Sequence, residues 1–311
     1  MLFILPILVL ATALCSGYFS LHPLQTIPVK GLINVPYIDG LNKISLSIAG
    51  FVLVVLLAFM IFFISERFKL LSQTTTLPSL IYVLLVSGIM INIGFDYLLI
   101  AVFVVALAVE RLQRAIDLSK SNAALFDFGF LILLAVAIYP KLIFLILWAL
   151  CVIFFSGRTT LKDLVALCIG LLTPLLLILF YYFWVDRLDQ FMNLFMNNLL
   201  MGEFMYQLPL IELIRLGMLF LLLLVALYHL STKYPLLMVN QRRGLLSLVS
   251  MLLFLVLTLF LIPGNLYNFM YMLALPLSFI YAQYFITSRV IAFSNLMFIW
   301  LLSACFLIYL V

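Results

Sequence analysis

The chain has 311 residues, 68% of them hydrophobic and 9% charged, with a formal net charge of +5. A soluble domain carries roughly 25% charged residues and needs a wettable surface, so this composition excludes a soluble protein and indicates a polytopic membrane protein. The positive excess is small and one-sided along the chain, which indicates membrane orientation and no nucleic-acid partner.

The apolar segments predict an all-α bundle, because a membrane-spanning helix needs about 20 mainly apolar residues. We expect about eleven spans (about 10 to 12) in a single integral membrane domain over residues 1–311, with no soluble domain left over. The third and fourth spans are either two full crossings or a tilted or re-entrant pair. The expected spans are 2–20, 45–65, 77–95, 96–111, 123–140, 142–157, 164–185, 212–231, 244–262, 268–287 and 290–310.

The first 20 residues lack both a basic stretch and a small-residue cleavage site, so they are interpreted as an uncleaved first span. Lys and Arg then set the orientation. Eleven of the sixteen lie in loops that follow even-numbered spans, and five lie on the opposite side. Because cytoplasmic loops are enriched in these residues, the N-terminus is predicted to be cytoplasmic and the C-terminus external.

One carboxylate, Asp127, stands in an otherwise apolar span. By this topology it lies in the first two turns of the fifth span, near the cytoplasmic headgroups and the helix N-terminus, where the helix dipole favours negative charge. Arg111 and Arg114 close the preceding span on the same side. The favoured interpretation is a structural carboxylate that caps the helix or pairs with these arginines. The alternative is a functional proton or ligand site.

The outward segment 186–211 has polar and apolar residues at helical spacing. Met, Phe and Leu fill one side of the predicted helix, and the polar face carries Asp186, Asp189, Gln190, Asn193 and Asn197. This pattern predicts an amphipathic helix in the outer interface, with residues 186–200 contacting membrane lipid or a membrane-protein partner. An equally weighted alternative is a re-entrant piece packed on the bundle.

The sequence lacks the common motifs of nucleotide-binding proteins and metalloproteases. The sequence has no Walker A loop, no GxGxxG and no HExxH, and its two histidines fall on opposite predicted sides of the membrane. We therefore expect no cofactor and no metal site. The predicted span centres are apolar and the charges lie at span ends, which weighs against a proton- or ion-coupled transporter.

An enzyme that acts on a lipid-linked sugar is the main functional alternative. Glycosyltransferases or polymerase-like enzymes with a polyprenyl-phosphate donor place an acidic residue in an outer loop near the headgroups. Asp39 is the candidate catalytic base here, and Arg187 and Lys43 are candidate contacts for phosphate or a lipid headgroup. The match is loose, because Asp39 stands alone where an acidic pair is expected and no large extramembrane domain is present.

Three segments resemble a family of polytopic inner-membrane proteins of Bacteroidetes, a domain of unknown function. They are residues 66–85, 107–147 and 272–285, and the most specific piece is LFDFGF at 125–130. The resemblance implies a location and a length but no activity, and it implies that the piece containing Asp127 is a family feature. The leading hypothesis is therefore an accessory or structural, multi-pass integral protein of the bacterial inner membrane and cell envelope.

Overall fold

The computed structural model describes residues 43–93, 97–117, 122–157, 160–200, 210–263, 266–288 and 290–307. Within these ranges the chain is helical and has no strand. The elements are α2 (Lys43–Arg67), α3 (Leu77–Ile93), α4 (Tyr97–Asp117), α5 (Asn122–Ile138), η1 (Pro140–Leu142), α6 (Phe144–Ser156), α7 (Leu161–Trp184), α8 (Leu188–Leu200), α9 (Leu210–Lys233), η2 (Tyr234–Leu236), α10 (Val239–Leu261), α11 (Leu266–Thr287) and α12 (Ile291–Phe306).

The all-helical class is confirmed, and each expected span after the first coincides with a helix. Five helices are long and apolar enough to cross a membrane, over Ile48–Arg67, Leu161–Trp184, Leu210–Leu236, Val239–Leu261 and Phe269–Thr287. The expected first span, 2–20, lies outside the described residues. The count of eleven spans and the cytoplasmic N-terminus therefore stay predictions.

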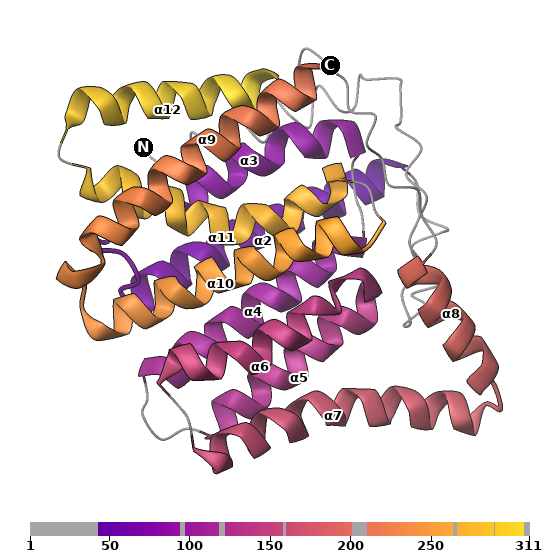
Figure 1. Cartoon of the computed structure of the whole chain (residues 1–311). Helices are drawn as coiled ribbons and strands as arrows, with labels where there is room; N and C mark the ends of the chain where they lie inside the picture. Colours follow the sequence, from indigo (N-terminus) through magenta and orange to yellow (C-terminus); the bar gives the residue numbers. More distant parts are fainter. Residues whose placement is uncertain are drawn as a thin grey trace.

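The axes of most helices are roughly parallel in Figure 1, and the helices are stacked from one side of the bundle to the other. α9 and α12 lie on one side, α7 lies on the other, and α4 lies between them. α4 contacts α2, α5, α10 and α11, and most of its residues are buried. α4, the expected fourth span, is thus an interior helix of the bundle, and whether the third and fourth spans each cross the membrane stays a prediction.

Two glycines bring α5 and α7 into backbone contact. A Cβ added at Gly129 would lie 2.7 Å from the carbonyl oxygen of Leu167, and one added at Gly170 would collide with the carbonyl oxygen of Phe126. Small residues let helices pack closely where lipid provides no hydrophobic drive for their association. Next to this contact, Phe128 packs edge-on against Trp148, with ring centroids 5.5 Å apart. Several residues of the 125–130 segment therefore make helix–helix packing contacts.

The connection between α6 and α7 shows how local chemistry turns the chain. α6 ends at Gly157, whose φ of 75° is left-handed and favours glycine. α7 begins after Thr160, whose hydroxyl oxygen accepts a hydrogen bond from the Asp163 backbone N–H at 3.3 Å. Because the residue that ends α6 is followed after a short connection by the residue that caps α7, these two helices are consecutive and form a helical hairpin.

α8 is the helix expected within 186–211, and it contacts α7 and η1. In Figure 1 it leaves the far end of α7 and stands apart from the main bundle. Phe191 is buried against Tyr182 of α7, while the five predicted polar residues are all exposed. Helix formation and the polar face are as expected, and lipid or partner contact at 186–200 stays a prediction.

The loops and helix ends gather at two ends of the bundle. We call the end that holds Lys69 and Gln241 the basic end. Here the Gln241 side-chain amide donates to the backbone oxygens of Lys69 and Leu71, at 2.9 and 3.1 Å. At the opposite end the Lys141 ammonium is buried and donates to the Pro263 oxygen at 2.6 Å. Long-range polar contacts thus tie the connections together at both ends.

Candidate functional site

A charge network at the basic end is centred on Glu110 of α4, whose side chain is only 6% exposed. Arg114 lies 2.7 Å from one carboxylate oxygen, Arg67 lies 3.4 Å from that same oxygen, and Arg111 lies 3.3 Å from the other. A buried carboxylate is costly unless it is paired, and here three guanidinium groups surround it. The network ties the end of α2 to the end of α4.

Asp127 belongs to this network. Its carboxylate lies 3.4 Å from the Arg111 guanidinium, and its side chain is 41% exposed. The expected pairing of Asp127 with Arg111 or Arg114 is therefore found for Arg111. Arg114 turns to Glu110 instead, because the two residues are one helical turn apart on α4. We define the basic-end network as Arg67, Glu110, Arg111, Arg114 and Asp127.

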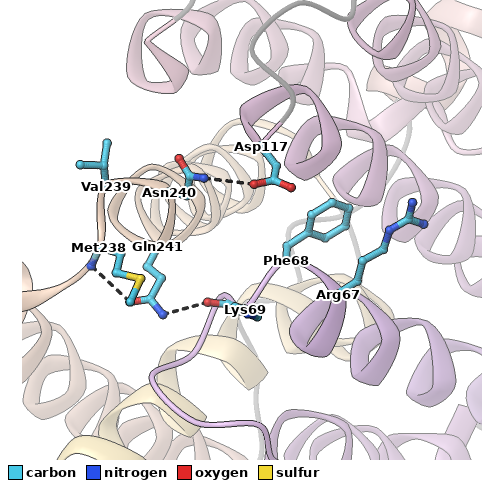
Figure 2. Close-up of a pocket in the computed structure, with 8 residues that line it drawn as sticks. All are labelled: Arg67, Phe68, Lys69, Asp117, Met238, Val239, Asn240 and Gln241. Carbon is cyan, nitrogen blue, oxygen red and sulfur yellow. Dashed lines mark hydrogen bonds between the residues drawn. The ribbon is translucent and has the colours of Figure 1, made fainter.

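A pocket of about 450 Å³ lies beside the network, between the end of α2 and the start of α10 (Figure 2). We call it the basic pocket. Among its described lining residues the two cations are Arg67, the last residue of α2, and Lys69 just after it, and the one carboxylate is Asp117 at the end of α4. Its complete lining is Arg67, Phe68, Lys69, Asp117, Met238, Val239, Asn240 and Gln241.

Local contacts hold the walls of the basic pocket in place. The Arg67 guanidinium lies over the rings of Phe63 and Phe68, 5.3 and 5.6 Å from their centroids, in cation–π geometry. The Asn240 amide donates to Asp117 at 3.1 Å. Lys69 has a φ of 46°, a backbone conformation uncommon for a side chain with a Cβ, and the Gln241 amide binds its carbonyl oxygen.

A second charged pair lies inside the bundle, and sequence reasoning missed it. Glu212 and Arg215, in the first turns of α9, are 1% and 4% exposed, with the Arg215 Nε donating to a Glu212 oxygen at 2.8 Å. We call them the interior pair. Within the described part of the chain, Glu212 Oε1 and Arg215 Nη2 have no hydrogen-bond partner.

Arg215 also lines a small interior cavity of about 10 Å³. The other residues around this cavity are apolar: Leu85, Leu219, Met270, Ala274 and Leu277. They come from α3, α9 and α11. Leu85 is at the midpoint of α3, and Leu277 is close to the midpoint of the Phe269–Thr287 segment, so the guanidinium reaches toward the middle of the bundle.

The residues expected for a lipid-linked-sugar enzyme are only partly described. Asp39 lies outside the described residues, and Lys43 opens α2 without a described side chain. Arg187 is exposed between α7 and α8, and its backbone N–H donates to the Tyr182 oxygen at 2.9 Å. Whether Asp39 and Arg187 meet in one cavity therefore stays a prediction.

Metal-ligating side chains are scattered in the ranges that the structure describes. No three His, Cys, Asp or Glu side chains there are grouped so that they could hold a metal ion. Three cysteines in these ranges, Cys151, Cys168 and Cys305, are free thiols.

Comparison with protein-family models, with curated proteins and with solved structures gave no match to this chain. The resemblance to the Bacteroidetes family stays a prediction.

Proposed function

We propose that the chain is an accessory, multi-pass integral protein of the bacterial inner membrane that works by helix packing and by binding anionic lipid headgroups at its basic end. The observation that carries this proposal is the basic pocket, whose lining includes two cations, Arg67 and Lys69, and a single carboxylate, Asp117. A phosphate group is the natural ligand for two cations on a surface next to lipid.

The charge balance around the pocket favours an anion. Asp117 is already hydrogen-bonded to Asn240, whereas the one ion-pair contact of Arg67 among the described residues, with Glu110, is 3.4 Å long, and the Arg67 side chain is 45% exposed. Taken together, the pocket and the basic-end network hold four cations and three carboxylates. The net surplus is one positive charge, and the most weakly paired cations, Arg67 and Lys69, both line the pocket.

The engaged state of Glu110 supports a role without catalysis. A general base needs a carboxylate that can reach a substrate proton, but both Glu110 oxygens are within 3.4 Å of arginines and the side chain is 6% exposed. Asp127 likewise contacts Arg111. These carboxylates hold the arginines in position, so they support the binding surface.

The positive-inside rule supports the location. Arg67, Lys69, Arg242 and Arg243 all lie at the basic end, with Arg243 next to Gly157 and Arg242 bonded to the Leu237 and Pro235 oxygens. Such an end belongs in the cytoplasm, where the leaflet carries anionic lipid and each nearby cation contributes about 1 kcal/mol of attraction.

The test is lipid retention by the full chain, measured by native mass spectrometry after titration with phosphatidylglycerol or phosphatidylcholine. We expect a preference for the anionic lipid. Replacing Arg67→Gln together with Lys69→Gln removes both pocket cations and should weaken phosphatidylglycerol binding by about 2 kcal/mol, roughly 30-fold, with little change for phosphatidylcholine.

The matched control is Lys162→Gln with Lys233→Gln, which removes the same charge from two residues that do not line the pocket. This variant should retain the anionic preference. Equal loss in both double variants would mean that net charge alone attracts the lipid. A wild-type chain without any preference for phosphatidylglycerol would contradict the proposal outright.

A further inference from the structure

The basic pocket also carries hydrogen-bond acceptors, which a phosphate group cannot use. Two of its lining residues, Asp117 and Asn240, come from the end of α4 and the start of α10 and are both exposed. Figure 2 shows them joined by the 3.1 Å hydrogen bond that the Asn240 amide donates. A phosphodiester offers acceptor oxygens and no donor, and a carboxylate repels it. A ligand that matches the whole lining must therefore carry hydrogen-bond donors as well as a phosphate.

The hydrogen bonds within the pocket decide which acceptors remain. The Gln241 side-chain oxygen accepts from the Met238 backbone N–H at 3.3 Å, and its amide donates to the Lys69 oxygen. The Asn240 nitrogen donates to Asp117, which leaves the Asn240 amide oxygen as an acceptor. Within the described part of the chain, Asp117 has no other hydrogen bond and no ion pair. Asp117 and Asn240 therefore each present an acceptor to a ligand or to water.

The charge and size of the pocket narrow the ligand further. Among the described lining residues the two cations, Arg67 and Lys69, outnumber the one carboxylate, so a headgroup with a single net negative charge fits best. This favours hydroxyl groups as the donors, because an ammonium group would neutralise the headgroup. The volume of about 450 Å³ is within the range of about 300–1,000 Å³ found for small-molecule sites. Met238 and Val239 add exposed apolar lining that suits a lipid.

Resting on the proposed lipid contact, we propose that the basic pocket recognises a phosphodiester headgroup whose far end carries hydroxyl groups, as a glycerol headgroup does. Arg67 and Lys69 bind the phosphate, and the oxygens of Asp117 and Asn240 accept hydrogen bonds from the hydroxyls. The carboxylate that weakens the binding of a bare phosphate thus provides selectivity among anionic lipids.

The competing explanation is that Asp117 is a hydrated surface carboxylate that only fixes the position of Asn240. It would then repel all anionic headgroups alike, and the pocket would not distinguish headgroups of equal charge. Phosphatidylglycerol and phosphatidylethanol separate the two explanations. Both are singly charged phosphodiesters, but only phosphatidylglycerol has hydroxyl groups at the far end of its headgroup.

The experiment is native mass spectrometry of the full chain after titration with these two lipids. We expect the wild type to bind phosphatidylglycerol roughly tenfold more tightly, as hydrogen bonds to a charged acceptor would provide. Asp117→Ala should reduce this ratio to about twofold or less, and should strengthen the binding of phosphatidylethanol because the repulsion is removed. The matched control is Glu66→Ala, which removes an exposed carboxylate that does not line the pocket and should leave the ratio unchanged.

Equal binding of the two lipids by the wild type would overturn this inference, and the wild type decides this even where a variant does not fold. If both lipids still bind more tightly than phosphatidylcholine, the proposed function stands without it. Binding of neither above phosphatidylcholine would refute both proposals. A tenfold ratio that persists in Asp117→Ala would overturn the role of the carboxylate. Displacement of phosphatidylglycerol by an equimolar amount of soluble glycerol phosphate would overturn the assignment to a lipid.

Discussion

The basic-end network and the interior pair use the same residue types at nearly the same helical spacing, in different surroundings. Glu110 and Arg114 are four residues apart, and Glu212 and Arg215 are three apart. Glu110 is surrounded by three arginines that are 28% to 45% exposed, whereas Glu212 and Arg215 are both buried and incompletely bonded. The comparison shows that the neighbours of an ion pair, more than its sequence spacing, set its cost and its role.

The largest expected effect comes from breaking the interior pair. Arg215→Leu leaves the Glu212 carboxylate buried without its cation and should lower the free energy of unfolding by about 3–5 kcal/mol. Equilibrium unfolding of the purified chain in mixed detergent micelles measures this. The double variant with Glu212→Leu should recover most of the loss. A single variant as stable as the wild type would contradict the burial of the pair.

Removal of the central carboxylate of the basic-end network should have an intermediate effect. Glu110→Gln leaves three partly hydrated arginines without their shared negative charge and with one acceptor oxygen in place of two, and we expect a loss of about 1–3 kcal/mol in the free energy of unfolding. Glu66→Gln is the control, because Glu66 is exposed at the same end. That change should stay within about 0.5 kcal/mol. An equal loss of unfolding free energy in Glu110→Gln and Glu66→Gln would contradict the central role of Glu110 in the network.

The exposed member of the network should matter least for stability. Asp127→Asn removes a 3.4 Å contact to Arg111 from a side chain that is 41% exposed, and exposed pairs contribute about 0–1 kcal/mol. The same unfolding measurement should therefore give a small loss. A loss above about 2 kcal/mol would show that Asp127 is far more tightly coupled than its contacts indicate.

Salt sharpens the comparison further. The Debye length falls from about 10 Å at 0.1 M to about 3 Å at 1 M ionic strength, so exposed charges are screened while buried ones are affected little. The small difference between the wild type and Asp127→Asn should shrink at 1 M salt. The difference between the wild type and Arg215→Leu should persist. A parallel decrease of both differences would place the interior pair in contact with solvent.

Much of the fold can be predicted from apolar segment length, because lipid imposes that length directly. The expected spans 77–95 and 268–287 correspond to Leu77–Ile93 and Leu266–Thr287. The pairing of Asp127 with an arginine was also predictable, because the loop between α4 and α5 is short and returns the chain to the same end. These inferences need only local sequence and the alternation of spans.

The interior pair and the basic pocket could not be found in this way. Glu212 and Arg215 lie near the end of an apolar segment, a position in the sequence where charged residues are usually hydrated. Packing by α3 and α11 buries the side of Arg215 that lines the cavity. The pocket joins Lys69 to Gln241, which are 172 positions apart in the sequence. Contacts of that range depend on the order in which the helices pack, and apolar periodicity does not encode it.

The most direct test of the central claim is the sidedness of the two ends of the bundle. The experiment uses a chain from which the four native cysteines have been removed. Leu236→Cys then reports on η2, beside the start of α10 at the basic end, and Gln190→Cys reports on α8. Both positions are exposed. A membrane-impermeant maleimide should label residue 190 only from outside the cell and residue 236 only in inverted vesicles. Labelling of both residues from the same side would contradict a membrane-crossing bundle with a cytoplasmic basic end.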